Sequence, residues 1–401
     1  MATDIETSGG ARASSSSSSS GLLNNPVFRS IAIQATLIIG LALFVWWLVD
    51  NTARNLAQAN IASGFGFLGD RAGFDIGQTP IEYSNSSTYG HALIVGLVNT
   101  LIVAGAGIIF ATLVGFIIGI GRLSQNFLVR LLSTVYVEIF RNIPPLLVIL
   151  FWYFGVISAL GSPRGISENP FGFYLTNRGL QTPSFAFEVL AWASFVVFAI
   201  AVVAAIVLAR RNKKHQLKTG DRKPTLWPVL GLVIGLPLIA FLVTGMPATI
   251  EVPTPGTFNL QGGFQMKPEF VALFLALSLY TAAFIAEIVR AGIMSVSKGQ
   301  TEASSALGLR RGLTLRLVIV PQAFRVIIPP LTSQYLNLIK NSSLGLAIGY
   351  PELFAIGTTV LNQSGQSIEI IVICMGIYLT ISIVVSIFMN WFNSKMALAE
   401  R

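Results

Sequence analysis

The sequence predicts an all-α polytopic membrane protein with about eight transmembrane helices. Of its 401 residues, 53% are hydrophobic and 11% are charged, whereas soluble domains carry about 25% charged residues. The apolar residues gather in blocks of about 20, the length that crosses the hydrocarbon of a bilayer. Lys and Arg residues lie in short segments between these blocks, so the net charge of +9 indicates membrane topology rather than nucleic-acid binding.

A polar, low-complexity leader precedes the first apolar block. Residues 1–30, with the serine run Ser14–Ser20, are expected to be disordered because they can bury little apolar surface. The block that follows is longer than the core of a signal peptide, and the leader has just two positive residues. We therefore expect a retained first span at 31–50, with a cleaved signal peptide as the alternative.

Seven further apolar blocks follow along the chain. The second and eighth blocks are long and almost free of charge, whereas polar side chains dilute the seventh. The fourth and fifth flank the most basic segment of the chain and are expected to form a hairpin at 187–246. The expected spans are 31–50, 92–121, 131–158, 187–209, 226–246, 269–292, 326–349 and 367–392.

Basic residues mark one side of the expected bundle. Segment 209–225 (ARRNKKHQLKTGDRKPT) has seven Lys and Arg residues, segment 293–325 has five, and segment 122–130 has two. By the positive-inside rule these segments and both termini lie in the cytoplasm. The opposite segments hold five basic residues in total and are rich in Gly, Asn, Pro and Ser, so they are expected to be surface loops. The four segments expected on this opposite side are 51–91, 159–186, 247–268 and 350–366.

Several kinds of chemistry are missing from the sequence. It contains no G-x-x-x-x-G-K-[ST] phosphate-binding loop and no H-E-x-x-H zinc motif. The two histidines, His91 and His215, fall on opposite sides of the expected bundle and cannot share a metal. A single cysteine, Cys374, excludes an internal disulfide and a Cys-rich metal site. We predict no catalytic residue, no metal and no cofactor, and therefore no enzyme.

Charged residues inside expected spans are candidates for function, because burying them in a bilayer is costly. Glu138 and Arg141 form one E-x-x-R pattern, and Glu287 and Arg290 form another. Each pair shares a helix face and is expected to form an ion pair. A structural role is the simpler interpretation, and a gating or pathway role is the alternative. Lys340 lies deeper in its span and could bind a substrate carboxylate or pair within the bundle.

Two double prolines occur in similar contexts, Pro144-Pro145 in RNIPPL and Pro329-Pro330 in RVIIPPL. Proline removes a helical hydrogen bond, and transmembrane helices tolerate this where neighbouring groups compensate. We expect each pair to kink its span.

The segment GQTEASSALGLRRGLTLRLVIVP (299–321) is more polar than its surroundings. Ser297 and Gln300 have the spacing of a capping box, helix formers follow, and Gly308 can end the helix in a left-handed conformation. We expect a helix of about two turns outside the membrane, a turn at Gly312, and a bend back toward the bilayer at Pro321. From the residues alone, this segment is either a docking surface or an ordinary connector.

The same segment resembles the EAA loop of ABC-importer permeases. That pattern is E-A-A, three residues, G, nine residues and I-x-L-P, and here it falls on Glu302, Ala303, Ser304, Gly308 and Pro321. The spacing matches throughout. A serine stands in the third position, and valines replace the Ile and Leu of the pattern.

Neighbouring segments are similar to permeases of the polar amino-acid uptake family. They are Asn99–Ser124, Tyr136–Val148, Tyr280–Leu309 and Leu338–Phe354. The resemblance implies a type I ABC-importer core of five spans, in the two parts 92–158 and 269–392. An extra span at 31–50 and the inserted pair 187–246 resemble the longer permeases for general L-amino-acid or glutamate/glutamine/aspartate/asparagine uptake.

The resemblance also implies partners and a location. The helix at 300–308, within the loop 293–325, would dock on a separate ABC ATPase subunit dimer. A second permease subunit, as a heterodimer rather than a homodimer, and a periplasmic amino-acid-binding protein would complete the system in the lipid of a bacterial inner membrane. An ion-coupled secondary amino-acid transporter and a membrane scaffold without a pathway are the alternatives. Which amino acids are carried is left open.

Overall fold

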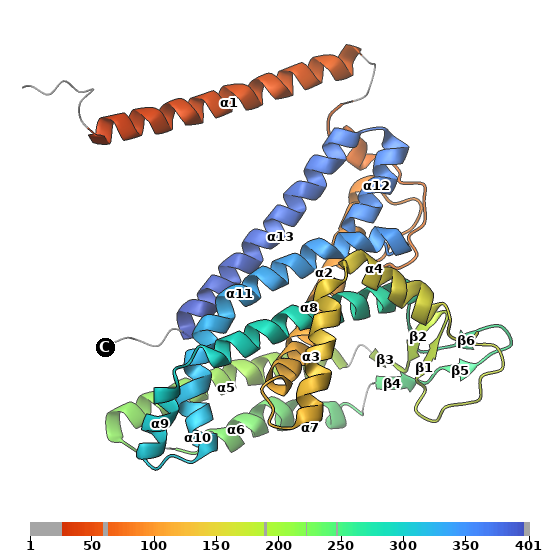
Figure 1. Cartoon of the computed structure of the whole chain (residues 1–401). Helices are drawn as coiled ribbons and strands as arrows, with labels where there is room; N and C mark the ends of the chain where they lie inside the picture. The colour runs from red at the N-terminus through yellow and green to blue at the C-terminus, as the bar shows by residue number, and fades with distance from the viewer. Residues whose placement is uncertain (1–25, 59–62, 188–190, 222, 246–247, 397–401) are drawn as a thin grey trace, which may run out of the picture. The chain divides into compact units, whose positions relative to one another are not determined.

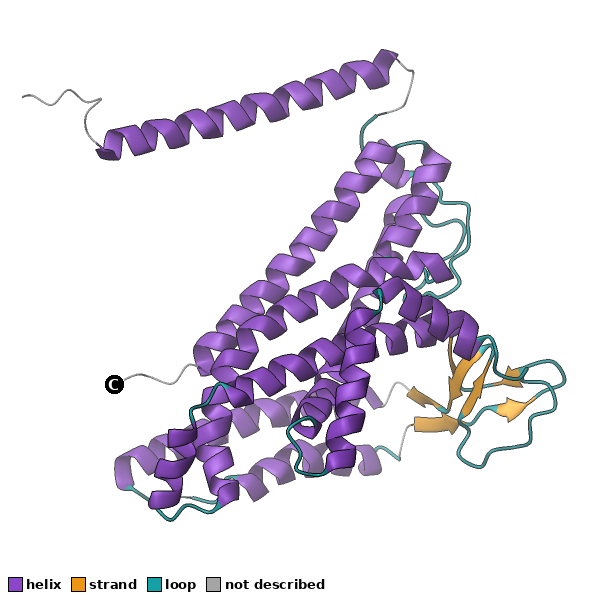
Figure 2. Ribbon diagram, in the orientation of Figure 1, coloured by secondary structure: helices purple, strands orange, loops and turns teal. Residues whose placement is uncertain are grey.

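The computed structural model describes residues 26–58, 63–187, 191–221, 223–245 and 248–396 (Figure 1). The chain divides into two units, Met1–Phe65 and Gly66–Arg401. Among the described residues, seven helices are long and apolar enough to cross a membrane, and one bent pair adds an eighth. Helices make up most of the described chain (Figure 2). The prediction of an all-α polytopic membrane protein is confirmed.

Within its described residues, the first unit contains one helix, α1 (Pro26–Gln58), whose large apolar side chains are exposed along its length. Residues 26–30, which the sequence analysis assigns to the disordered leader, belong to this helix instead. Pro26 can start a helix because its missing N–H would have no partner in the first turn. The predicted disorder of residues 1–25 lies outside the described residues.

Helix α8 (Pro268–Met294) packs against α2 (Tyr89–Gly121) through a stripe of small residues on α2. A Cβ atom at Gly119 would lie 2.7 Å from the carbonyl oxygen of Ala286, and one at Gly115 would lie 2.6 Å from Cγ2 of Ile285. Small residues at such positions allow two transmembrane helices to approach closely. The close approach fixes the end of α2 against the C-terminal half of α8.

The expected third span is a bent pair rather than one helix. Helix α3 (Phe127–Asn142) ends before the double proline, and α4 (Pro145–Leu150) starts at its second proline and continues as π-helical turns to Ile157. The two parts are bent by 111°. Neither proline has an N–H to donate, and the residue before a proline is driven to extended backbone, as at Ile143 with φ −105° and ψ 134°.

The second double proline has a different outcome. Pro329 and Pro330 lie inside α11 (Val320–Asn341), which continues as a 3-10 helix to Ile348. The adjacent Ile328 and Leu331 are buried in the apolar core that α8 shares with α11. Burial of that face offsets the lost hydrogen bonds, so the helix runs on through the prolines.

The segment 350–366, expected to be a surface loop, is largely a packed helix, α12 (Leu353–Ser364), between α2 and α13 (Ser367–Met396). Glu352 is fully buried and caps α12, accepting hydrogen bonds from the backbone N–H groups of Phe354 (2.8 Å) and Ala355 (2.6 Å) and from the Tyr378 hydroxyl (2.7 Å). These donors compensate the cost of burying a carboxyl group. The expectation of a surface loop at 350–366 was therefore wrong, because the Glu352 cap starts a helix that packs against α2 and α13.

The helix pair expected as an insertion at 187–246, called the inserted hairpin below, consists of α5 (Ala191–Thr219) and α6 (Leu226–Leu230), followed by π-helical turns and α7 (Leu236–Val243). The basic segment, expected to be a loop from residue 210, continues α5 as helix to Thr219. Arg, Lys, Gln and Leu are good helix formers, and positive charge at a helix C-terminus is favourable.

Short strands lie at the N-terminal end of α8, in segments expected to be plain loops (Figure 2). β3 (Ser184–Phe187) pairs with β4 (Ala248–Glu251) and closes the base of the inserted hairpin. Each strand has two to four residues, too few to give a clear period-2 pattern in sequence. The remaining strands are β1 (Tyr174–Thr176), β2 (Gly179–Thr182) and β7 (Phe264–Met266), which form one antiparallel sheet, and the pair β5 (Thr254–Pro255) and β6 (Leu260–Gln261).

Candidate functional site: the α9 loop and the Arg122 cluster

Helix α9 (Lys298–Ala306) follows α8 after three residues, at the end of α8 opposite the strands. Glu302 and Ala303 are exposed on it, whereas Ser304 is buried and donates a hydrogen bond from its hydroxyl to the Gln300 carbonyl at 2.7 Å. A serine at the motif's third position is therefore accommodated, because its hydroxyl has a partner within its own helix. The short helix predicted at 300–308 is present and starts two residues earlier.

Gly308 ends α9 with φ +72°, the left-handed conformation that the sequence analysis expects. The N–H of Leu309 donates to the Ser304 carbonyl at 3.1 Å, and the N–H of Gly308 donates to the Ser305 carbonyl at 2.9 Å. This is the Schellman arrangement, in which both bonds satisfy carbonyls at the end of a helix.

The predicted capping box does not form. Ser297 occupies the N-cap position, but its side chain makes no capping hydrogen bond. The Gln300 side chain, expected to turn back to Ser297, instead accepts a hydrogen bond from Nε2 of Gln322 at 3.2 Å. A tertiary contact has replaced the local one, and it ties α9 to α11.

The chain beyond Gly308 also differs from the expected turn and bend. Gly312 lies inside α10 (Arg311–Thr314), and π-helical turns (Leu315–Ile319) join α10 to α11. Pro321 is in the first turn of α11, directly after these helical turns, so it lies within a helical path rather than at a bend. The reversal occurs at Gly308–Arg310, and a helical path then runs from Arg311 to Ile348.

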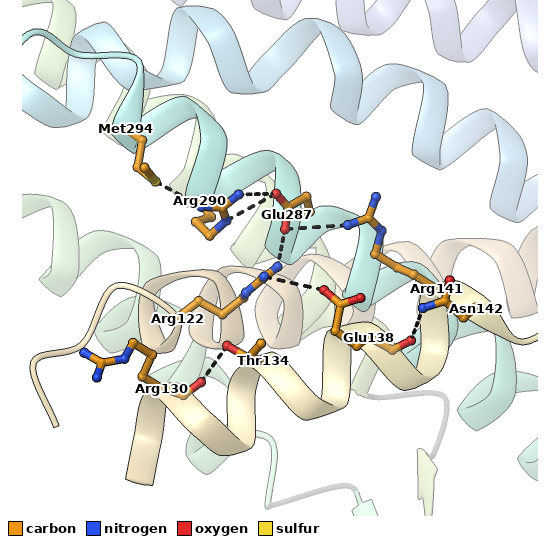
Figure 3. A network of polar contacts seen from close by, with 9 residues as sticks. All are labelled: Arg122, Arg130, Thr134, Glu138, Arg141, Asn142, Glu287, Arg290 and Met294. Atoms are coloured by element: carbon orange, nitrogen blue, oxygen red, sulfur yellow. Dashed lines mark hydrogen bonds and ion pairs between the residues drawn. The ribbon is translucent and has the colours of Figure 1, made fainter. Parts of the chain in front are cut away.

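Three arginines and two glutamates form a cluster where α2, α3 and α8 meet (Figure 3). Glu287 of α8 is its centre: it pairs with Arg122, with Arg290 (Nη2–Oε1 2.6 Å) and with Arg141 (Nη1–Oε2 3.7 Å). Arg122 also lies 3.8 Å from Glu138, measured from Nη2 to Oε1. The Arg122 side chain is 10% exposed and that of Glu287 is 23% exposed, whereas Glu138 is 57% exposed.

The cluster brings together the four residues of the predicted E-x-x-R pairs, with one change of partner. Glu287 and Arg290 pair within α8 as expected. In the part of the chain that the structure describes, Glu138 pairs with Arg122, the C-cap residue of α2, and Arg141 pairs with Glu287 of α8. The expected pair between Glu138 and Arg141 is therefore replaced by contacts between helices.

Sequence reasoning missed Arg122, which it counted only as a topological charge. The available signal is its position, directly after the small-residue stripe that ends in Gly119 and Gly121. Such a stripe marks a close helix contact, so the first charged residue after it can reach the neighbouring helix. The Tyr136 hydroxyl, which donates to the Leu279 carbonyl at 2.6 Å, fixes α3 against α8 beside the cluster.

Lys340 lies elsewhere, at the C-terminal end of α11 and away from the cluster. It is exposed and lines a mostly apolar groove of about 610 Å³ with Ser343, Tyr378 and Ser382. Its backbone carbonyl accepts a hydrogen bond from the Ser343 hydroxyl at 2.8 Å. Among the described residues no carboxylate forms an ion pair with Lys340.

Comparison with known proteins identifies the family. The family model described as "binding-protein-dependent transport system inner membrane component" matches residues 111–398. The chain belongs to this family. It is therefore a multi-pass inner-membrane transport subunit rather than an enzyme, and transport by such a system depends on a binding protein.

Two curated relatives match this transport subunit over most of its length. The general L-amino acid transport system permease protein AapQ of Rhizobium johnstonii is 58% identical over 94% of this chain and 94% of its own. The glutamate/glutamine/aspartate/asparagine transport system permease protein BztB of Rhodobacter capsulatus is 44% identical over 95% and 96%. A solved structure described as an amino acid ABC transporter with histidines is 20% identical, with a TM-score of 0.46 over 77% of this chain and 95% of its own.

The left-handed cap of α9 gives a local prediction for this permease subunit. Gly308→Ala is expected to destabilise the end of α9 by about 1 kcal/mol, because the Cβ of an alanine crowds the backbone in the left-handed conformation. The cost is backbone strain, since no atom lies within 4 Å of the new Cβ. Gly312→Ala is the matched control: it also meets open space, but α10 has helical φ there, so the substitution should be neutral or slightly stabilising.

Hydrogen exchange of the α9 amides in the purified protein measures this difference. Faster exchange in Gly308→Ala than in Gly312→Ala is the expected result. Equal exchange in the two variants would show that the left-handed cap does not stabilise α9.

Proposed function

We propose that this chain is the permease subunit of an ATP-driven importer of amino acids and that α9 couples it to a separate ATPase. The observation that carries the proposal is α9 itself, a capped and exposed helix that bears Glu302 on its surface and is fixed to two core helices. Family membership and the amino-acid permeases among its relatives support the substrate class.

The contacts of α9 suggest how a push on it would reach the spans. Three residues join α9 to α8, and the bond between Gln300 and Gln322 joins it to α11. Movement of α8 would then carry Glu287 and, through its ion pairs, α2 and α3. Charge pairs that cross helices can transmit displacement because their partners are rigid parts of packed elements. The cluster would thus act as a gating device on the side of the ATPase.

The proposed assembly has further subunits. An ABC ATPase dimer would bind α9 on the basic, cytoplasmic side, and both termini would lie on that side. A second permease, different from this chain, would complete the pathway, and an amino-acid-binding protein would deliver substrate to the opposite side. A substrate role for Lys340 stays a prediction of the same scheme: its ammonium group suits the carboxylate that all amino acids share.

Site-specific cross-linking tests the docking of α9. Cys374 is buried, so Ala303→Cys supplies an exposed thiol that can carry a photo-activated cross-linker in membranes of the host. We expect a covalent adduct that contains a P-loop ATPase, identified by mass spectrometry. The matched control is Glu82→Cys, which places the same group on an exposed residue of the opposite loop.

Two results would contradict docking at α9. One is an adduct at residue 303 without any P-loop ATPase. The other is an equal yield of the ATPase adduct from residue 82, which would indicate non-specific labelling.

A further inference from the structure

The inserted hairpin contains a pocket that the proposed import mechanism does not use. It has a volume of about 420 Å³ and lies between the last turns of α5 and the segment 223–227. From α5 it is lined by Ala209, Asn212, Lys213 and Gln216, whose spacing of i, i+3, i+4 and i+7 puts them on one helix face. Lys223 and Trp227 are among the residues that close the other side.

A hydrogen bond holds the two walls of this pocket together. Nδ2 of Asn212 donates to Oγ1 of Thr225 at 3.1 Å, so the end of α5 is tied to the start of α6. The Thr225 hydroxyl in turn donates to the Lys223 carbonyl at 3.2 Å. Lys213 and Lys223 therefore line opposite walls of one pocket.

The pocket lies at the depth of lipid headgroups. The apolar part of α5, residues 191–209, rises about 28 Å, close to the thickness of the bilayer hydrocarbon. Lys213 follows one turn beyond that boundary. On the other wall Trp227 is 76% exposed at the start of the second apolar stretch, the place where tryptophan anchors a span at the membrane interface.

Charge around the pocket favours an anion. The segment 209–225 has seven Lys and Arg residues, and Asp221 is its one acidic residue in the sequence. Exposed Leu226 and Trp227 continue the pocket toward the apolar outer surface of the hairpin, where Ile234 is also exposed. A free phosphate would leave this apolar edge unused, whereas a phospholipid has both an anionic headgroup and acyl chains that cover it.

We propose that the pocket between α5 and residues 223–227 binds the headgroup of an anionic phospholipid. Lys213 and Lys223 would contact the phosphate, the Gln216 amide would hydrogen-bond a headgroup hydroxyl, and Trp227 would pack on the glycerol and upper acyl chain. The lipid would fix the orientation of the inserted hairpin at the basic side of the membrane.

Native mass spectrometry of the purified full chain with added phosphatidylglycerol, or phosphatidylcholine of the same acyl chains, tests the site. We expect preferential binding of phosphatidylglycerol. The double variant Lys213→Gln/Lys223→Gln should weaken that binding by about tenfold, because each lysine near an anionic headgroup contributes to the free energy of lipid binding. The matched control Lys214→Gln/Lys218→Gln removes the same charge from α5 residues that do not line the pocket and should change binding less than about twofold.

A second variant and a competition arm keep the test decisive. Trp227→Ala leaves the charge unchanged and should also weaken phosphatidylglycerol binding, and millimolar inorganic phosphate should not displace the lipid. If the two double lysine variants lost phosphatidylglycerol binding equally, the binding would reflect general charge attraction, and the proposed site would be wrong. Equal binding of phosphatidylcholine, or displacement by phosphate alone, would overturn the lipid assignment.

Discussion

Glu302→Lys is expected to abolish ATP-driven amino-acid uptake while the protein still inserts in the membrane. The Glu302 side chain is exposed on α9 and forms no hydrogen bond or ion pair with another described residue, so the substitution should leave the fold unchanged. If α9 docks on an ATPase subunit, a positive charge replaces the negative charge at the contact. Like-charge contacts across an interface cost several kcal/mol, so uptake should fall by more than about tenfold.

Uptake of labelled amino acids by cells that express each variant measures the effect, with the amount of inserted protein as reference. Asp221→Lys is the matched control, because it makes the same charge change at an exposed residue of the α5–α6 connection. It should transport normally. Undiminished uptake in Glu302→Lys would exclude this residue from the coupling contact, and an equal loss in Asp221→Lys would indicate a general effect of charge.

The spans were predictable because hydropathy is a property of local composition. The expected spans 92–121, 269–292 and 367–392 agree with α2, α8 and α13 to within four residues at each end. The end of α9 was equally predictable, since a glycine after a short run of helix formers has few alternatives. In these cases a few neighbouring residues are enough to predict where the helix lies or ends.

The two double prolines show where local sequence stops being sufficient. Pro144-Pro145 separates two helices bent by 111°, whereas Pro329-Pro330 lies within a helix that continues. The dipeptides are the same, and so is the preceding isoleucine. What differs is the packing of the adjacent turn, which depends on residues far away in sequence and is not encoded in the pattern itself.

Of the five residues in the Arg122 cluster, the sequence analysis named four as candidates, and it missed Arg122 and the contacts between helices. The contact between Arg122 and Glu287 joins positions 165 residues apart. The strand pair β3–β4 joins the segments before and after the helix pair expected at 187–246. Such pairings depend on how helices assemble. Sequence spacing predicted the partner of Glu287 on its own helix, Arg290, but could not predict the partners from neighbouring helices, Arg122 and Arg141.

Glu287→Gln is expected to lower the free energy of unfolding by roughly 2–3 kcal/mol, because it leaves three arginine side chains facing one another without their shared carboxylate. Glu138→Gln is the matched control in the same cluster. Glu138 has one arginine at 3.8 Å and is largely exposed, so its loss should cost less than about 1 kcal/mol.

Denaturant titration of the two purified variants measures this difference, and uptake assays show whether the cluster also transmits movement. If the ion pairs of Glu287 carry displacement from α8 to α2 and α3, Glu287→Gln should lower uptake even where the ATPase still binds α9. Similar stability losses for the two variants would mean that Glu287 is not the centre of the cluster. Normal uptake in a Glu287→Gln protein of reduced stability would leave the cluster a structural role and remove it from the coupling path, because a transmitting contact cannot be dispensable for transport.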